Sequence, residues 1–127
     1  MSSTFDVIVI GGGPVGENVA DFATRSGLSA VIVEAELIGG ECSYWACVPS
    51  KTLLRTGNAV AAVRRLPGTT AEFDPAAVLA RRDYFTNNWN DEGQLEWARS
   101  AGIAVLRGHG RLAGEKTVVV DDAPAGP

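Results

Sequence analysis

Cysteine, histidine, basic runs and long apolar segments are all scarce in this sequence. Its 127 residues include two cysteines and one histidine, and its formal net charge is −4. The basic residues form no run, which argues against a nucleic-acid or anionic-membrane partner. No apolar stretch approaches the roughly 20 residues of a membrane span, and the apolar start is too short for a signal peptide. We therefore expect a cytoplasmic protein that is long enough for one domain with a buried core.

The scarcity of soft ligands also argues against a metal site. A structural zinc ion needs four ligands, typically from closely spaced cysteine or histidine pairs. Besides Cys42 and Cys47, His109 is the only further soft ligand in the sequence, and no carboxylates are spaced as additional metal ligands. We expect no bound metal.

The start of the chain has the pattern of a β-α-β unit. Residues 5–10 form a β-branched apolar run of buried-strand length, and residues 28–34 form a second one. Between them Gly27 suits a helix end. The apolar side chains that recur there at helical spacing are Val15, Val19, Phe22 and Ala23. Strand, glycine turn, helix and strand in this order predict an α/β fold with a Rossmann-like parallel sheet.

The rest of the chain continues the alternation of helices and strands. Residues 50–66 are predicted to be a helix despite Gly57, and Asp74 with Pro75 is typical of an N-cap followed by proline at the first helical position. The further expected elements are a helix to Gly102 with a break near residues 87–90, a strand over 103–108, a small antiparallel β element over 110–122, and a loop over 123–127.

Gly11, Gly13 and Gly16 fit the pattern G-x-G-x-x-G between a strand and a helix. The first glycine permits the tight turn, the second lets a pyrophosphate approach the backbone, and the third lets helix and strand pack closely. The phosphates would then lie at the positive end of the helix. Glu34 ends the second strand, where a carboxylate can accept hydrogen bonds from both ribose hydroxyls of an adenosine; the alternative is a solvated carboxylate. The pattern predicts a bound dinucleotide and does not separate FAD from NAD.

The two cysteines lie five positions apart and leave three alternatives: a redox pair, a metal site or two separate core thiols. On a regular helix their Cα atoms would be roughly 8.5 Å apart, beyond the span of about 4.4–6.8 Å that a disulfide requires. Pro49 has no N–H and its ring clashes with the carbonyl of Trp45, so a regular helix is disfavoured here. A distorted turn would let the sulfur atoms meet. Because the ring is so small, its closure adds little entropic stability, which suits a bond that opens and closes.

The segment that holds both cysteines, "GGECSYWACVPSK" at residues 39–51, resembles the active-site segment of the class I pyridine nucleotide-disulfide oxidoreductases. That family includes lipoamide dehydrogenase and the glutathione, mycothione and mercuric reductases, and its usual pattern is G-G-T-C-x-N-x-G-C-x-P-S-K. The residues that match the family in order are Gly11, Gly13, Gly16, Glu34, Gly39, Gly40, Cys42, Cys47, Pro49, Ser50 and Lys51. The later "GIAVLRGHGRLAG" resembles the family's third strand and the glycine turn near the adenine.

The resemblance implies a role for each part of the site. The adenosine of FAD would lie over the glycine turn with Glu34 on its ribose. Cys47 would be the thiol that exchanges electrons with the flavin, Cys42 the thiol that meets the substrate, and Lys51 a cation near flavin N5. The implied catalytic residues are Cys42, Cys47 and Lys51, and the implied cofactor-binding residues are Gly11, Gly13, Pro14, Gly16, Glu34, Ala35, Gly40, Glu41, Cys42, Cys47, Lys51 and Gly110.

The resemblance also implies an enzyme larger than this chain. Electrons would pass from NAD(P)H through FAD to the disulfide of Cys42 and Cys47, and then to a small-molecule or protein disulfide substrate. Residues 1–127 would be the N-terminal part of an FAD-binding domain in a homodimer, with the NAD(P)-binding and dimerisation domains absent. His109 lies at the adenine end and would not be the catalytic base. The alternative is a stand-alone nucleotide-binding module without turnover.

Four residues depart from the family pattern between and beside the cysteines. Glu41 stands where threonine is usual, and Tyr44, Trp45 and Ala46 replace the usual Asn-x-Gly. Glu41 adds a carboxylate near the phosphates, and Trp45 is large enough to narrow the approach to the disulfide. These departures favour a substrate other than lipoamide or glutathione.

Overall fold

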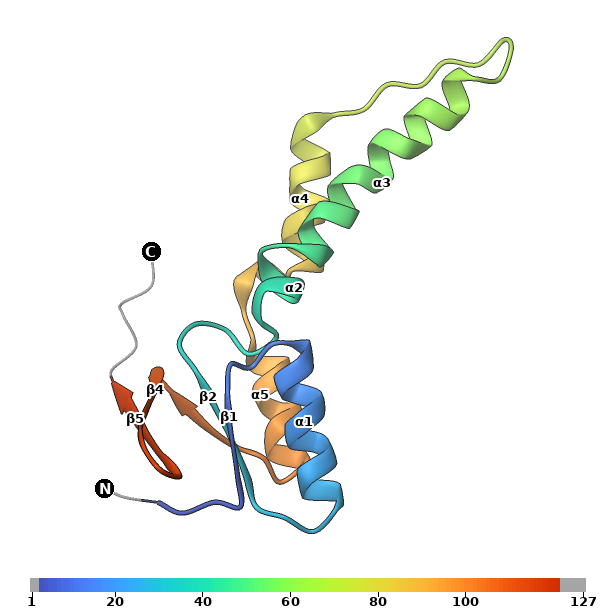
Figure 1. Cartoon of the computed structure of the whole chain (residues 1–127). Coiled ribbons are helices and arrows are strands. Elements are labelled where there is room, and N and C mark those ends of the chain that lie inside the picture. The colour runs from blue at the N-terminus through green and yellow to red at the C-terminus, as the bar shows by residue number, and fades with distance from the viewer. Residues whose placement is uncertain (1–2, 122–127) are drawn as a thin grey trace. The chain divides into compact units, whose positions relative to one another are not determined.

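The computed structural model describes residues 3–121, which fall into two compact units (Figure 1). The sheet unit comprises residues up to Gly40 and from Asp91 onward, and the helical unit comprises Glu41–Asn90. The expected loop over residues 123–127 lies outside the described residues. The helical unit is thus an insertion within the sequence of the sheet unit.

A three-stranded parallel sheet forms the centre of the sheet unit. Its order is β1 (Val7–Ile10), β2 (Ala30–Glu34) and β3 (Ala104–Arg107). The middle strand is buried along its first four residues, whereas β1 alternates between half-buried and exposed side chains. The parallel α/β sheet predicted from the sequence is therefore confirmed, with strands slightly shorter than the apolar runs.

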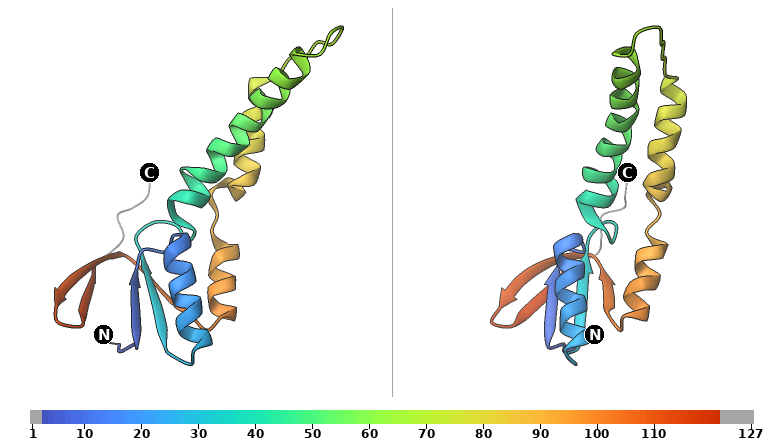
Figure 2. Two further views of the ribbon diagram at one scale, coloured as in Figure 1. Left: turned by 45° about the vertical axis from the view of Figure 1, so that its right-hand side comes forward. Right: turned by 90° about the vertical axis from the view of Figure 1, so that its right-hand side faces the viewer.

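Two helices, α1 (Pro14–Arg25) and α5 (Glu92–Ser100), cover one face of this sheet (Figures 1 and 2). The core between helices and sheet is made of small and β-branched side chains: Ala20, Ala23, Ala30, Ile32, Ile38, Ala98 and Ile103. Most of the apolar residues from which α1 was predicted do not belong to this core, because Val15, Val19 and Phe22 are exposed. Small residues lie on the buried face because the helix packs closely against the sheet.

A two-stranded antiparallel element completes the sheet unit. It consists of β4 (His109–Gly114) and β5 (Thr117–Asp121). The start of β4 crosses the sheet face opposite the helices, where a Cβ atom added at Gly110 would lie 3.0 Å from a methyl carbon of Val33. The predicted small β element is confirmed.

The helical unit is built around an antiparallel pair of helices, α3 (Cys47–Arg64) and α4 (Pro75–Phe85), which run side by side in Figure 2. The short helix α2 (Gly40–Tyr44) leads into α3, and the 3-10 turn η1 (Asn87–Trp89) follows α4. The predicted N-cap is confirmed, because the Asp74 carboxylate accepts a hydrogen bond from the N–H of Ala76. No helix among residues 3–121 is both long and apolar enough to cross a bilayer.

Candidate functional site

The glycine turn after β1 is shaped by close backbone contacts. Gly11 has a φ of +100°, which favours glycine, and its N–H donates to the carbonyl of Val33 at 2.8 Å. A Cβ atom added at Gly16 would lie only 2.0 Å from the carbonyl oxygen of Gly11, so no side chain fits there. At Gly13 the same test finds nothing within 4 Å. Gly11 therefore turns the chain and Gly16 permits close packing, as predicted, while the backbone at Gly13 borders open space.

A second glycine pair, Gly39 and Gly40, lies against this turn. The N–H of Gly39 donates to the carbonyl of Gly12 at 2.7 Å, and a Cβ atom at Gly40 would lie 2.8 Å from the Cα of Gly13. Gly39 and Gly40 have positive φ values of 113° and 58°. No separate role was predicted for Gly12 or Gly39, although uninterrupted glycine runs at both positions indicate a close approach of two backbones.

Glu34 is held at the turn by two backbone groups. One carboxylate oxygen accepts the N–H of Gly12 at 2.7 Å and the other accepts the N–H of Glu36 at 2.7 Å. The side chain is half-buried and hydrogen-bonded, and is therefore not the freely solvated carboxylate of the alternative interpretation. Its position at the carboxyl end of β2 is where open α/β sheets bind ligands.

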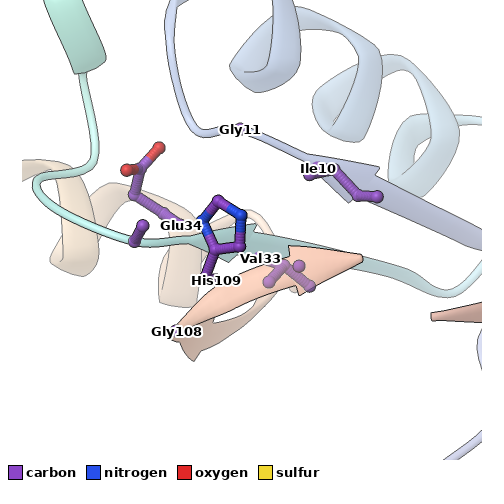
Figure 3. A pocket seen from close by; sticks show the side chains of 8 residues that line it. Ile10, Gly11, Val33, Glu34, Gly108 and His109 are labelled. Carbon is purple, nitrogen blue, oxygen red and sulfur yellow. The ribbon is translucent and has the colours of Figure 1, made fainter. Parts of the chain in front are cut away.

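A pocket of about 200 Å³ lies beside Glu34 at this end of the sheet (Figure 3). Its lining residues are Ile10, Gly11, Val33, Glu34, Ala35, Gly108, His109 and Gly110. Figure 3 shows the side chains of Ile10, Val33, Glu34 and His109 around this pocket. The structure thus brings together the glycine turn, the consecutive pair Glu34 and Ala35, and Gly110, which come from three separate parts of the sequence.

The residues of the sheet unit fit a dinucleotide. Gly13 is the N-cap of α1 and no side chain caps the helix, so the first N–H groups at its positive end have no side-chain acceptor at the N-cap. The groove around Gly13 and Pro14 has a volume of about 320 Å³. Burial raises the pKa of Glu17, in the first turn of α1, above its ordinary value.

The two cysteines flank a break between two helices of different length. Cys42 lies in α2, and Cys47 is the first residue of α3. The carbonyl of Glu41 accepts the N–H groups of both Trp45 and Ala46, at 2.9 and 2.6 Å, which ends α2. The distorted turn predicted from Pro49 is therefore confirmed. Within the described residues both side chains are half-buried thiols rather than a disulfide.

The charged residues predicted beside the cysteines are exposed. Glu41 lies in the first turn of α2, and Lys51 lies in the second turn of α3. No cluster of three or more metal-ligating side chains occurs among residues 3–121. The candidate site of the sheet unit is thus made mainly of glycine backbone, whereas the helical unit separately carries two thiols and a lysine.

Comparison with known proteins decides the family, because the profile of "pyridine nucleotide-disulphide oxidoreductase" matches residues 5–124. The chain belongs to the pyridine nucleotide-disulphide oxidoreductase family. Dihydrolipoyl dehydrogenase from Chlorobaculum tepidum is 34% identical over 126 residues, which cover 94% of this chain and 26% of that protein. Mercuric reductase from Staphylococcus aureus is 28% identical and is covered over 22% of its length.

Solved structures agree with this family membership at the level of the fold. LpdA from Mycobacterium tuberculosis superposes with a TM-score of 0.67 at 27% identity, over 85% of this chain and 24% of that one. The flavoprotein disulfide reductase RclA from Escherichia coli, solved as a Cu(II) complex, has a TM-score of 0.74 at 20% identity, over 94% and 25% of the two chains. The chain therefore spans about a quarter of the length of the dihydrolipoyl dehydrogenase and of the two solved chains named here.

Proposed function

We propose that this chain is the FAD-binding and thiol-bearing part of an NAD(P)H-dependent disulfide oxidoreductase. The observation that carries the proposal is the pairing of a glycine turn and Glu34 in the sheet unit with a cysteine pair across a helix break in the helical unit. In a chain of this family both parts are expected in one enzyme. Residues 1–127 would then be the N-terminal part of its FAD-binding domain.

The sheet unit would hold the adenosine and pyrophosphate of FAD. Open space at Gly13 and the uncapped first N–H groups of α1 suit the phosphates. Glu34 would bind the ribose, and the backbone of Gly110 together with Ala35 would line the adenine side of the pocket. The close contact of Gly40 with Gly13 supports a place for Gly40, and for Pro14 beside it, at the same phosphates.

The helical unit would carry the redox pair. Oxidation joins Cys42 and Cys47 by one S–S bond and releases two electrons and two protons; reduction reverses this. FAD, when bound, would supply the chemistry that links these two electrons to NAD(P)H. Cys47 would be the flavin-side thiol, Cys42 the thiol that attacks the substrate disulfide, and Lys51 a cation near the flavin, with Glu41 beside it.

The remaining features of the proposal concern the protein as a whole. The substrate would be a small-molecule or protein disulfide, and the enzyme would work as a homodimer in cell redox homeostasis. A cytoplasmic location suits the cycle, since thiols are kept reduced there between turnovers. The names of the relatives support two substrate classes, the dihydrolipoyl group and mercuric ion. The exposed Trp45 between the cysteines favours a substrate other than the dihydrolipoyl group.

A single methyl group tests the nucleotide half of the proposal. The Gly13→Ala variant should fold normally, because a Cβ atom there meets no protein atom within 4 Å and φ is −78°. If phosphates approach this backbone, the methyl group should weaken FAD binding at least about tenfold, equal to about 1.4 kcal/mol. FAD titration followed by flavin fluorescence measures this effect. Gly57→Ala, at a helical glycine whose surroundings are equally open, is the matched control, and equal affinities for the two variants would refute the assignment.

Two serine variants test the roles of the thiols in the FAD-loaded protein. Cys42→Ser should keep or enhance a long-wavelength absorbance between thiolate and flavin, because Cys47 would remain as a thiolate with no partner for a disulfide. Cys47→Ser should abolish that absorbance. Visible spectra of the reduced proteins measure it, and the reverse pattern would exchange the two roles.

A further inference from the structure

An aromatic side chain lies between the two cysteines and is stacked on a residue far away in the sequence. The rings of Trp45 and Trp89 are stacked with centroids 6.2 Å apart and an interplanar angle of 28°. The guanidinium of Arg82 lies over the Trp89 ring, 5.3 Å from the ring centre. All three residues belong to the helical unit. The turn between the thiols is thus contacted from the segment that follows α4.

Trp89 also forms a hydrogen bond at the point where α2 ends. Its indole N–H donates to the carbonyl of Tyr44 at 3.1 Å. The last carbonyl groups of a helix have no intrahelical partner, and Tyr44 is the last residue of α2. Trp89 therefore caps α2 with a side-chain donor, directly at the helix break that separates Cys42 from Cys47.

The backbone that presents Trp89 is in an uncommon conformation. Asn87, Asn88 and Trp89 have φ values of 51°, 51° and 55°, a run of left-handed residues without a glycine. Asparagine tolerates this region, but a bulky tryptophan rarely adopts it. The neighbouring Thr86 is almost fully buried and bonds the carbonyls of Arg82 and Asp83. Such backbone conformations persist where the surroundings hold them and often accompany functional sites.

We propose that Trp89 is a positioning residue for the cysteine pair. It holds the break between α2 and α3, both by its hydrogen bond to Tyr44 and by its stack on Trp45. In an unbroken helix the two Cα atoms would be roughly 8.5 Å apart, too far for a disulfide. A turn that is held in the broken form loses less conformational freedom when the ring closes, so the clamp favours the disulfide over the dithiol. The inference rests on the proposed role of Cys42 and Cys47 as a redox pair.

The balance of the reaction defines the measurement. When Cys42 and Cys47 form their disulfide, oxidised dithiothreitol accepts the two electrons and two protons and becomes the open dithiol. Equilibration of the 127-residue chain in buffers of known oxidised-to-reduced dithiothreitol ratio, followed by alkylation and mass measurement, gives the equilibrium constant. No flavin is needed for this readout, so it is independent of catalysis.

Three variants isolate the contribution of the clamp. Trp89→Phe retains a ring and removes the N–H donor, and Trp89→Ala removes both contacts. We expect Trp89→Ala to shift the equilibrium about tenfold toward the dithiol, which raises the potential by about 30 mV for two electrons, with Trp89→Phe in between. Trp97→Phe, which changes the tryptophan packed on the core of the sheet unit, should leave the equilibrium unchanged.

The outcomes separate the two levels of the proposal. If the wild-type chain forms no intramolecular disulfide at any ratio, the proposed redox pair is refuted and the positioning role with it. If the wild type forms the disulfide but the Trp89 variants match Trp97→Phe, the positioning role alone is refuted. A shift toward the disulfide in the Trp89 variants would equally overturn it. Should Trp89→Ala fail to fold, Trp89→Phe still decides the question.

Discussion

The two units of the molecule differ in the contacts that hold their turns in place. In the sheet unit, backbone lies against backbone: Gly16 against Gly11, and Gly40 against Gly13, at distances that exclude any side chain. In the helical unit, position is set by side chains, through the Trp45–Trp89 stack and the cap of α2. The described helix α4 contains no buried residue at all. The proposed phosphate-binding surface is thus made of bare backbone, whereas the turn between the proposed redox cysteines is held by side-chain contacts.

The largest expected effect on stability comes from substitution of two helical glycines, one in each unit. A methyl group at Gly16 would collide with the Gly11 carbonyl at 2.0 Å and with a methyl carbon of Val9 at 3.1 Å, so Gly16→Ala should lower the free energy of unfolding by about 3 kcal/mol. At Gly57 the space is open, and Gly57→Ala should raise it by about 0.5 kcal/mol through helix propensity. Urea unfolding measures both. Destabilisation of similar size at both sites would remove the contrast between the units.

A side chain that holds backbone in the sheet unit gives the next largest effect. Glu34→Gln replaces one carboxylate acceptor by an NH2 group that faces a backbone N–H, either of Gly12 or of Glu36. We expect the free energy of unfolding to fall by about 2 kcal/mol, the range for hydrogen bonds to a charged group. Glu36→Gln, whose exposed side chain lies outside these contacts, is the control and should change stability by less than about 0.5 kcal/mol. Matching values for the two variants would show that the turn holds itself without Glu34.

The N-cap of α4 provides a smaller effect in the helical unit. Asp74→Ala removes the acceptor for the N–H of Ala76 and should lower the free energy of unfolding by about 1 kcal/mol. Asp74→Asn keeps an acceptor oxygen and should stay close to the wild type. Thermal or urea unfolding monitored by circular dichroism at a helical wavelength measures the difference. If Asp74→Asn is as damaging as Asp74→Ala, the contribution comes from charge rather than from capping.

The smallest effect is expected at Asp6, where a side chain joins the starts of β1 and β2. Hydrogen bonds from the Ser29 hydroxyl and the Ser29 backbone lower the pKa of Asp6 below its ordinary value of 3.8. A lowered folded-state pKa contributes stability that is present above pH 3.8 and is lost as the pH falls through the folded value. The difference in unfolding free energy between wild type and Asp6→Asn should therefore be small near neutrality and vanish in strong acid. A difference that grows on acidification would contradict this.

The sequence predicted the sheet unit well where short-range rules decide the structure. A β-branched run, a glycine turn and a helix stop at Gly27, which has a φ of +83°, are local signals, and β1, α1 and β2 followed from them. The burial of α1 did not follow, because the close approach of helix and sheet selects Gly16 and Ala20 for the core and leaves Val15 and Phe22 exposed. The distance between packed elements is a tertiary property that helical spacing does not contain.

In the helical unit the helix break between the cysteines could be predicted from the sequence. The contacts of Trp89 that hold this break could not. Pro49 disfavours a continuous helix by local chemistry alone. The left-handed turn at Asn87–Trp89 and its bond to Tyr44 depend on residues more than 40 positions apart, and no short pattern marks such a pair. The only signal for Trp45 was its departure from the family pattern.

The placement of the helical unit between β2 and α5 also affects how the chain folds. The sheet requires β2 and β3 to pair in parallel, so the chain between Glu34 and Ala104 must close a long loop. The helical unit ties its own ends together, since the Tyr44 hydroxyl lies 3.5 Å from the carbonyl of Asn90 and Trp89 bonds back to Tyr44. Once formed, it shortens the effective loop roughly threefold and lowers the entropic cost of closure by about 1 kcal/mol. A hairpin whose ends are joined by its own contacts thereby makes the parallel pairing of β2 and β3 less costly in entropy.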